Sequence, residues 1–497
     1  MELPIFTFFI SEHEARCKRN ELKERIKFGK YFVYTDVNTL YDFKSEGNNG
    51  CAVFGLAVNV ITGESDNIAD KIIDNCLNIE EVIEYEKQLG GKYIIIFRKD
   101  NKYYLLGDAT CSIPVYYSTT KSFICSSNCQ YIVNENNYKQ DHECSYIRRS
   151  GDISQAMPFD ITSYREIKQM LPNHYLEFAN RKSIRFVNAN TQQEIVSADD
   201  AAEVTAPMIA NMCEFYQKKY SIKCPITSGR DSRVVLAFLR SKDSVPCYTI
   251  RHANHSGSEE DLVIPPDICK LCHTPYEQIV DCEVPLELSN HIDDLLGKDQ
   301  YSHRTLQIAY TIKKHYGSSA VINGDIIGQV GKCSLHRDIP AVFATPKYFR
   351  CKLHNYSKQS VRYIKDWIDE IRNSEEKVNL FDLFSIENRM GRWASQENLI
   401  YNSIGQAYLN VFNSRRIIYA WTAVSRKERK KSLIHNALIN RVNNKLLEVP
   451  FHSDSKISIK ISKATGMNYL IASYAKYYME CIRFRRRQIN EKNNSYS

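Results

Sequence analysis

The residues best suited to do chemistry lie together in the middle of the chain, at Thr227–Ser232. This Thr-Ser-Gly-Arg-Asp-Ser segment separates a short apolar run, Ile222–Ile226, from a run with helical spacing, Arg233–Leu239. A strand–turn–helix unit of this kind directs backbone N–H groups and hydroxyls towards one point, and the helix dipole adds positive potential there. The turn therefore predicts an anion site, with phosphate as its natural ligand.

One carboxylate, Asp231, stands inside this cradle. A carboxylate beside phosphate is repulsive unless a cation lies between them, and Mg²⁺ held by carboxylate and phosphate oxygens resolves the conflict. A simpler interpretation stays open, because Ser, Asp and Gly commonly turn the chain and cap a helix without binding anything.

The segment resembles the Ser-Gly-Gly-x-Asp-Ser pyrophosphate loop of the asparagine synthetase superfamily, whose members, the β-lactam synthetases included, split ATP between its α and β phosphates. Gly229, Asp231 and Ser232 match that loop, whereas Thr227 and Ser228 replace a serine and a glycine. The resemblance implies that Asp231 binds the metal and that the ATP and pyrophosphate contacts come from Thr227, Ser228, Gly229, Arg230 and Ser232.

Further motifs resemble the same superfamily, in the same order along the chain. They are Gly90–Phe97, Gly107–Tyr117, Ile167–Leu176, Glu387–Trp393, Phe412–Arg416 and Leu446–Phe451. The resemblance implies an α/β plus β-sandwich protein with two domains. Residues 1–190 would form an Ntn-hydrolase-like domain, a degenerate class II glutamine amidotransferase, and residues 200–497 a parallel α/β domain of the PP-loop ATP pyrophosphatase type.

The chain departs from the superfamily at its N-terminus. Glutamine-dependent members expose a cysteine nucleophile after removal of Met1, but here residue 2 is Glu2 and the first cysteine is Cys17. Such a nucleophile uses its own α-amine as the base, so an internal cysteine cannot replace it. We expect no glutaminase activity, as in β-lactam synthetases, where an amine of the substrate replaces ammonia.

The superfamily's second ATP motif, Gly-x-x-x-Asp-Glu, is altered. Aligned on Gly324, its acidic pair falls on Gly328 and Gln329, which leaves Asp325 as the carboxylate of this turn. Two interpretations stay open: Asp325 takes the second metal-binding role from a shifted position, or the site is weakened.

Three other segments carry candidate residues. The resemblance places adenine and substrate contacts where Ile250 and Arg251 lead into a polar loop that contains Asp261. Glu387, with Arg389 and Arg392, could orient a carboxylate substrate or make ordinary ion pairs. Ring-closing relatives keep a lysine that steadies the transition state, and the candidates for it here are Lys456, Lys460 and Lys463, with a solvated loop as the alternative.

The elements that must position these residues follow from periodicity. Short β-branched and aromatic runs predict a strand-rich sandwich, namely Tyr31–Thr35, Ala52–Val58, Lys92–Phe97, Tyr103–Leu106, Val115–Ser118 and Phe123–Cys125. Residues 188–194 are polar and predict a linker. Beyond a helix over Asp199–Tyr216, the apolar runs Ile222–Ile226, Cys247–Ile250 and Ala320–Ile322 are separated by helical patterns, which is typical of a parallel sheet covered on both faces. Helices are expected from Tyr356 onwards.

Composition limits the class of protein. With 43% hydrophobic and 25% charged residues, the 497-residue chain is typical of a globular protein of two or three domains. Its net charge of +8 is too mild to indicate nucleic-acid binding. No apolar run approaches the roughly 18 residues of a membrane span. Sixteen cysteines in a long chain without a signal-peptide pattern favour free thiols and a cytoplasmic location.

Together these features predict a glutamine-independent, ATP-dependent, amide-forming ligase that requires Mg²⁺. A small-molecule or peptide carboxylate would become an acyl-adenylate with release of pyrophosphate, and an amine would then displace AMP, in the biosynthesis of a natural product, a modified peptide or a surface polysaccharide. Whether a homodimer or a pathway partner protein is involved stays open. The alternatives are a catalytically degraded binding or scaffold subunit, and a PP-loop enzyme that transfers ammonia or sulfur.

Overall fold

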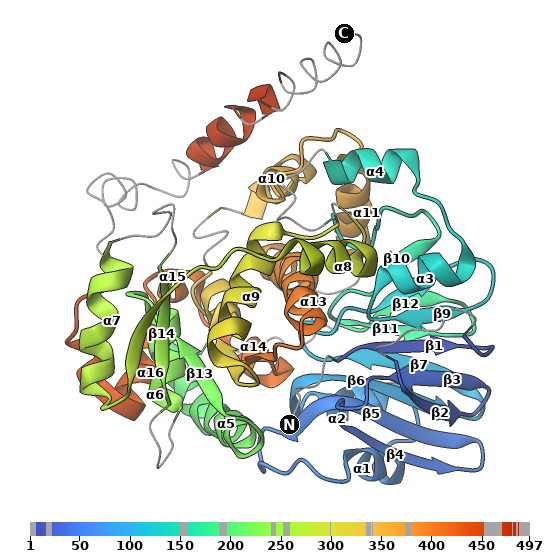
Figure 1. Cartoon of the computed structure of the whole chain (residues 1–497), viewed down its shortest axis with the longest axis horizontal. Helices are drawn as coiled ribbons and strands as arrows, with labels where there is room; N and C mark the ends of the chain where they lie inside the picture. Colours follow the sequence, from blue (N-terminus) through green and yellow to red (C-terminus); the bar gives the residue numbers. More distant parts are fainter. Residues whose placement is uncertain are drawn as a thin grey trace.

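Two six-stranded antiparallel sheets and one five-stranded parallel sheet make this chain an α/β protein (Figure 1). The structure is a computed structural model. It describes residues 6–15, 22–149, 157–187, 196–239, 245–251, 259–298, 300–333, 339, 341–372, 379–451, 470–479, 481–483 and 486. The predicted linker, residues 188–194, lies outside the described residues.

The two antiparallel sheets use the N-terminal part of the chain. The first has the strand order β10-β8-β9-β1-β3-β2, with β1 (Phe8–Ser11), β2 (Glu24–Phe28), β3 (Tyr31–Thr35), β8 (Tyr116–Ser118), β9 (Ile124–Ser126) and β10 (Ile167–Gln169). The second has the order β12-β11-β7-β6-β5-β4, with β4 (Tyr41–Glu46), β5 (Asn49–Asn59), β6 (Leu89–Lys99), β7 (Lys102–Gly107), β11 (His174–Glu177) and β12 (Lys182–Arg185).

The sheets pack through aromatic side chains, as a sandwich requires. The ring of Tyr31 on β3 meets that of Tyr103 on β7 edge-on, with 4.8 Å between centroids. Helices α1 (Ile68–Asn75) and α2 (Ile79–Glu86) cover the other face of β5 and β6. Because both of its faces are covered, β6 is buried almost throughout and reads as a continuous apolar run rather than an alternating one.

A tight hairpin joins β6 to β7. Lys99 pairs with Lys102, and the two residues between them, Asp100 and Asn101, both have positive φ, at 49° and 61°. Two-residue hairpin loops favour this left-handed pair, which Asp and Asn tolerate better than most residues. Helices α3 (Cys129–Asn136) and α4 (His142–Arg149) follow the paired strands β8 and β9.

The parallel sheet has the order β15-β14-β13-β16-β17. Its strands are β13 (Ile222–Pro225), β14 (Cys247–Arg251), β15 (Tyr276–Val280), β16 (Ala320–Asn323) and β17 (Tyr408–Asn410). The chain forms β13, moves outwards to β14 and β15, and returns to the other side of β13 for β16 and then β17. The direction of winding therefore reverses between β13 and β16, and open parallel sheets bind ligands at the carboxyl ends of the strands at such a point.

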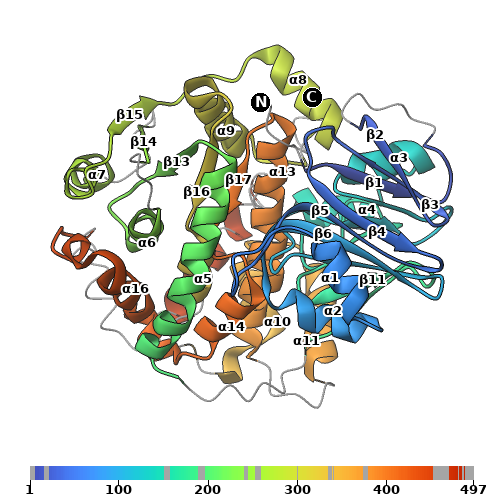
Figure 2. The same cartoon turned by 90° about the horizontal axis from the view of Figure 1, so that it is seen from below.

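Helices cover this sheet on both faces. Helix α5 (Ala198–Lys219) begins at a capping box made by Ser197 and Asp200. The other helical segments are α6 (Arg230–Phe238), α7 (Glu260–Leu271), α8 (Leu286–Leu296), α9 (His303–Tyr316), α10 (Pro346–Lys352), α11 (Ser360–Arg372), α12 (Leu380–Leu383), α13 (Ser395–Ser403), α14 (Arg415–Thr422), α15 (Arg426–Lys430), α16 (Leu433–Asn443), the π-helical η1 (Ile327–Gly331) and η3 (Phe384–Ala394), and the 3₁₀ segments η2 (Ala341–Phe343) and η4 (Asn444–Leu447). Figures 1 and 2 show α13 between the parallel sheet and the antiparallel sheets.

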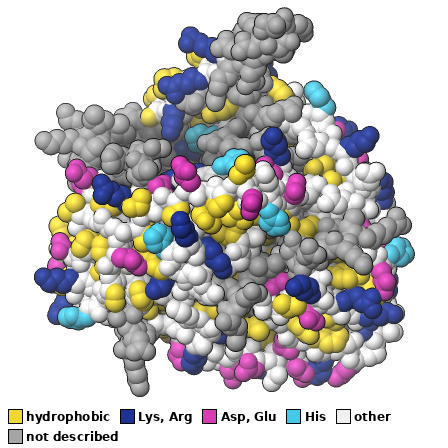
Figure 3. Space-filling view, viewed as in Figure 1, with side chains coloured by type: hydrophobic (Ala, Val, Ile, Leu, Met, Phe, Trp, Pro, Cys, Tyr) yellow, Lys and Arg dark blue, Asp and Glu magenta, His cyan; other side chains and the backbone are white. Residues whose placement is uncertain are grey.

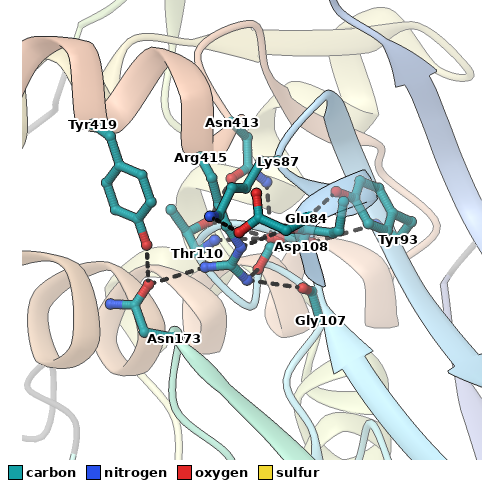
Figure 4. Close-up of polar contacts among 11 residues, drawn as sticks. Glu84, Lys87, Tyr93, Gly107, Asp108, Thr110, Asn173, Asn413, Arg415 and Tyr419 are labelled. Carbon is teal, nitrogen blue, oxygen red and sulfur yellow. Dashed lines mark hydrogen bonds and ion pairs between the residues drawn. The ribbon is translucent and has the colours of Figure 1, made fainter. Parts of the chain in front are cut away.

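A buried polar seam joins the sandwich to the α/β part (Figure 4). At its centre the guanidinium of Arg415, the first residue of α14, donates to Glu86 Oε2 at 2.5 Å, Asn173 Oδ1 at 3.0 Å and the Gly107 carbonyl at 3.2 Å. Beside it, Asn413 Nδ2 donates to Asp108 Oδ1 at 2.9 Å. The Gly-Asp turn after β7 thus serves as a docking point for the helical half.

The predictions for strands, cysteines, membrane spans and surface charge can be compared with the structure. The strand runs and the parallel sheet are confirmed, but β17 interrupts the stretch expected to be helical. The cysteines in the described ranges are free thiols, mostly buried. Among the described helices, none has both the length and the apolarity to cross a membrane. On the face drawn in Figure 3, basic and acidic side chains are interspersed.

Candidate functional site

The Thr227–Ser232 loop lies at the carboxyl end of β13, beside the point where the winding reverses. Gly229 is the N-cap of α6 and contributes no side-chain cap hydrogen bond to the helix. Thr227 is exposed, Ser228 is buried, and the residues from Gly229 to Ser232 are partly exposed. The loop therefore presents the start of a nine-residue helix at an accessible sheet edge, as an anion site requires.

The turn after β16 packs directly against this loop. A Cβ added at Gly324 would meet the Asp231 carbonyl oxygen at 3.1 Å, and one at Gly328 would meet Asp231 Oδ2 at 2.6 Å. Glycine at both positions lets the two turns approach this closely. Gly328 occupies the first position of the superfamily's acidic pair, so a carboxylate there would displace Asp231. The two predicted motifs are thus brought together in space.

The carboxylate of Asp231 is held by a residue that sequence reasoning missed. His435 Nε2 on α16 lies 2.8 Å from Asp231 Oδ1, and the His435 side chain is fully buried. Burial acts to raise the pKa of Asp231, but the hydrogen bond and charge of His435 outweigh it and the pKa is lowered. Asp231 is therefore kept ionised and pointed at the second turn.

Asp325, the other predicted metal ligand, lies in the second turn. Its Oδ2 accepts a hydrogen bond from the Tyr408 hydroxyl of β17 at 3.1 Å. Burial, and after it the negative charge of Asp231, raise the pKa of Asp325. The negative charges of the two carboxylates thus repel one another, which a bound cation would relieve.

These donors fit Mg²⁺. Both residues offer hard carboxylate oxygens, and Mg²⁺ is usually held by one or two carboxylates together with substrate phosphates rather than by a complete protein cage. No group of three or more His, Cys, Asp or Glu side chains suited to a metal occurs within the described ranges.

The loop's own N–H groups have partners inside the protein. Ser228 N and Oγ both donate to Asp261 Oδ1 in the first turn of α7, at 2.9 Å and 2.5 Å. Thr227 N donates to Ser232 Oγ at 3.1 Å, and Gly229 N donates to Thr227 Oγ1 at 3.2 Å. The Asp261 carboxylate therefore already accepts hydrogen bonds from the loop, and it brings a negative charge of the protein to the predicted anion site.

The basic residues of the loop region, Arg230 and Arg233, contact the segment that follows α16. The guanidinium groups of Arg230 and Arg233 lie over the ring of Phe451, at 3.8 Å and 4.1 Å from its centroid. Arg233 is fully buried and donates to the carbonyl oxygens of Ser228, Leu446, Val449 and Pro450. Arg233 thus fixes the loop to the segment after α16, a role that the loop motif alone did not reveal.

Ile250 and Arg251 end β14, the strand next to β13. The neighbouring Thr249 hydroxyl donates to the Ile226 carbonyl at 2.7 Å, immediately before the loop. Both predicted nucleotide contacts therefore lie at the same sheet edge as the loop.

Glu387 and Lys456 are placed differently. The buried carboxylate of Glu387, in η3, accepts hydrogen bonds from Arg185 of the sandwich at 2.5 and 2.9 Å and from Trp367 Nε1 at 2.8 Å. These contacts make Glu387 part of the joint between the two halves of the molecule, and its role in orienting a substrate for catalysis stays a prediction. Lys456 lies outside the described residues.

A small cavity connects Asp325 with the sandwich. It has a volume of about 20 Å³, room for roughly one water molecule. Its wall includes Asp325, Asn410 and the sandwich residues Lys92 and Thr110. Lys92 Nζ donates to Asn398 Oδ1 at 2.8 Å and Asn402 Oδ1 at 2.9 Å, and burial lowers the pKa of this ammonium group to about 7. In the sequence, the only indication of this buried ammonium group is a single lysine in the apolar run of β6.

A second ionisable group missed by sequence reasoning is Glu397 of α13. Burial and the charge of Asp325 raise its pKa to about 8, and Thr305 Oγ1 donates to it at 3.4 Å. The rings of Tyr401 and Tyr408 stack at 4.2 Å between centroids beside this group. Asp325 therefore has a neighbouring carboxyl group, Glu397, whose protonated form is favoured at neutral pH.

Comparisons with known proteins give distant likenesses only. No family model matches the sequence, and no curated protein sequence matches it. Among solved structures, the chain is similar to the glutamine phosphoribosylpyrophosphate amidotransferase from B. subtilis complexed with ADP and GMP. That alignment has 9% identity and a TM-score of 0.22, and it covers 53% of this chain and 56% of the other.

Two further solved structures are similar in part. NMN synthetase from Francisella tularensis aligns at 9% identity and a TM-score of 0.20, covering 52% of this chain and 98% of the other. A structure described as the allosteric regulatory enzyme of purine biosynthesis aligns at 10% identity and a TM-score of 0.24, covering 58% and 64%. This chain thus spans less than two thirds of the length of the first and third proteins.

Proposed function

We propose that this protein is an ATP-dependent, AMP-forming carbon–nitrogen ligase of the kind that the asparagine synthetase resemblance implies. It would activate a carboxylate as an acyl-adenylate, release pyrophosphate and pass the acyl group to an amine. Free carboxylates are poor electrophiles at neutral pH, so formation of an amide from one requires such activation.

One observation carries the proposal. The loop after β13 and the turn after β16 meet at the point where the winding of the parallel sheet reverses, and each brings one carboxylate, Asp231 or Asp325. Reversal points of open α/β sheets are where nucleotide ligands bind. The juxtaposition rests on topology and contact distances in this chain, independently of the sequence motif.

Different residues would bind the pyrophosphate, the metal and the nucleoside. The hydroxyls of Thr227, Ser228 and Ser232 and the N-terminus of α6 would hold the departing pyrophosphate. Asp231, oriented by His435, and Asp325 would hold Mg²⁺. When bound, Mg²⁺ offsets the negative charge that develops on the leaving group. Ile250 and Arg251, at the end of β14, would border the nucleoside.

A pyrophosphate-release assay over a panel of carboxylates and amines tests this proposal. We expect Mg²⁺-dependent release with at least one pair, and a loss of about 100-fold or more in Asp231→Ala, as is usual when a group that stabilises transition-state charge is removed. Glu370→Gln, a change at the surface of the molecule away from the loop, serves as the matched control. Release that is unchanged in Asp231→Ala would refute the proposal.

A second candidate function is favoured by the contact between Ser228 and Asp261. Because an internal carboxylate satisfies the loop's donors, the chain would keep the fold but act as a binding or scaffold subunit without nucleotide chemistry. Asp261→Asn separates the two functions. If the loop is a working phosphate site, removing this negative charge tightens ATP binding in calorimetry. If the chain is a binding subunit, neither the wild type nor the variant binds ATP.

A further inference from the structure

A second cavity lies between the two halves of the molecule, on the other side of the η3–α13 segment from Asp325. It has a volume of about 50 Å³, room for a few water molecules. Helix α3 and the segment from Met157 to Tyr164 form its wall on the sandwich side, and η3, α13 and the end of α8 form the opposite wall. The Asn128 side chain joins these walls by donating to the Leu295 carbonyl at 2.8 Å, where α3 and α8 lie side by side (Figure 1).

A buried arginine borders this cavity. Arg392 is only 1% exposed, and its Nε and Nη2 donate to the carbonyl oxygens of Met157 at 3.1 Å and Ile161 at 2.8 Å. Its remaining nitrogen, Nη1, has no hydrogen-bond partner in the described part of the chain. Nor does Arg392 form an ion pair with any described carboxylate, and Asp160 acts on it through its charge without a contact of that kind. A guanidinium that is buried without a counter-charge is costly, and a ligand anion would remove that cost.

The rest of the lining fits an anion as well. A second guanidinium, Arg148, borders the cavity, and no aspartate or glutamate is among its described lining residues. Gln396 lies one helical turn after Arg392 and also faces the cavity, as does Tyr116. Burial raises the pKa of Tyr116 to about 12 although the charge of Arg392 acts to lower it, so this hydroxyl stays protonated and can donate.

The cavity also has apolar lining residues, Leu296, Leu399 and Ile400. Its size and its mixture of basic and apolar lining residues suit a carboxylate with a short hydrocarbon chain, in which the head contacts the guanidinium and the chain contacts the leucines. Inorganic phosphate would satisfy the charge but would leave the apolar residues without a partner.

We propose that this cavity, with Arg392 as its anchor, is a binding site for a small organic carboxylate that bridges the two halves of the molecule. The ligand contacts both walls at once, so its binding stabilises their association. Neither Asp231 nor Asp325 lines this cavity, and its proposed ligand is not a nucleotide, so the proposal is independent of the proposed ligase activity.

Thermal unfolding and calorimetry of the full chain test the site with acetate, propionate and butyrate at matched ionic strength. Propionamide, the neutral analogue, and inorganic phosphate are the comparison probes. We expect saturable stabilisation by propionate or butyrate and none by propionamide or phosphate. If no carboxylate binds saturably, the site does not exist. If phosphate binds in preference to the carboxylates, the proposed ligand class is wrong.

Two variants separate binding from folding. Arg392→Gln removes the anchor but also disturbs two buried hydrogen bonds. Gln396→Glu instead supplies an internal carboxylate one turn from Arg392, which should preserve the fold and weaken propionate binding by about ten-fold or more through loss of a charged contact. Gln359→Glu, an exposed site with the same change of charge, is the control and should bind as the wild type does. Wild-type affinity in Gln396→Glu would overturn the proposal.

Discussion

Burial sets the ionisation state of single side chains where the sandwich meets the α/β part. Lys92 is the clearest case, because its ammonium is 2% exposed and its contacts are neutral amide and carbonyl oxygens. The folded chain releases its proton near pH 7, whereas the unfolded chain keeps it up to the ordinary value of about 10.5. Between these values the unfolded state binds more protons, so raising the pH stabilises the fold.

Lys92→Met tests this effect. From about pH 7 to pH 9, the unfolding free energy of the wild type should rise by roughly 2 kcal/mol relative to that of Lys92→Met, because only the wild type loses the cost of a buried cation. Below pH 7 the two profiles should run parallel, with Lys92 charged in both the folded and unfolded states. Urea unfolding across the pH series measures the difference. Profiles that stay parallel up to pH 9 would show that Lys92 keeps its proton.

Some residues of the candidate site could be predicted from the sequence, and others could not. Asp231 and Asp325 were found because each lies in a local pattern of glycine, hydroxyl and carboxylate residues. Their partners were not: Asp261 lies 33 positions from Ser228, and His435 lies 204 positions from Asp231. Nothing in the neighbourhood of a histidine on an amphipathic helix indicates such a distant contact, which the packing of α16 on α6 creates.

Among the elements, η3 joins the halves of the molecule through Glu387. Its carboxylate bonds Arg185 at the end of β12 and Trp367 of α11, so three elements converge on one buried charge. Arg185 has a second carboxylate neighbour, Glu370, whose side chain is 51% exposed and whose Oε1 lies 3.4 Å from Arg185 Nε. The same arginine thus offers a buried and an exposed ion pair for comparison.

We expect Glu387→Gln to lower the free energy of unfolding by about 3–5 kcal/mol, because it leaves the buried Arg185 guanidinium without its main counter-charge. Glu370→Gln should cost under about 1 kcal/mol, since solvent screens the exposed pair. Urea unfolding of both variants, with unchanged m-values, gives the comparison. Equal losses in the two variants would contradict the assignment of Glu387 to the joint.

Element prediction succeeded where the signal was local. The apolar or aromatic runs that were predicted to be strands form β3, β5, β6 and β13 in the structure. Strand β17 was missed because it has only three residues, Tyr408–Asn410, between helices, and because its partner β16 lies 87 positions earlier. Short strands of this kind form by long-range pairing rather than by local propensity.

At the scale of the whole molecule, the sandwich and the α/β part share one apolar core. That core includes Phe54 and Ile94 of the antiparallel sheets together with Cys224 and Ile322 of the parallel sheet. With the Arg415 seam added, the two halves should unfold together rather than as independent domains.

Arg415→Met tests that coupling, because it leaves the buried carboxylate of Glu86 without its counter-charge. We expect a loss of about 3–5 kcal/mol in the free energy of unfolding and faster hydrogen exchange in both halves at once. Arg441→Met, which removes exposed ion pairs to Asp199 and Glu203, is the control and should have little effect. Faster exchange confined to one half would show that the halves unfold separately.

The most direct test of the account is calorimetric titration of the full chain with ATP, with and without Mg²⁺, in the wild type and in Asp231→Asn. If the two turns at the reversal of the sheet form a nucleotide site, the wild type binds ATP only when Mg²⁺ is present, and the amide variant loses that dependence together with most of the affinity. A wild type that shows no heat of binding, or a variant that binds as the wild type does, would contradict it.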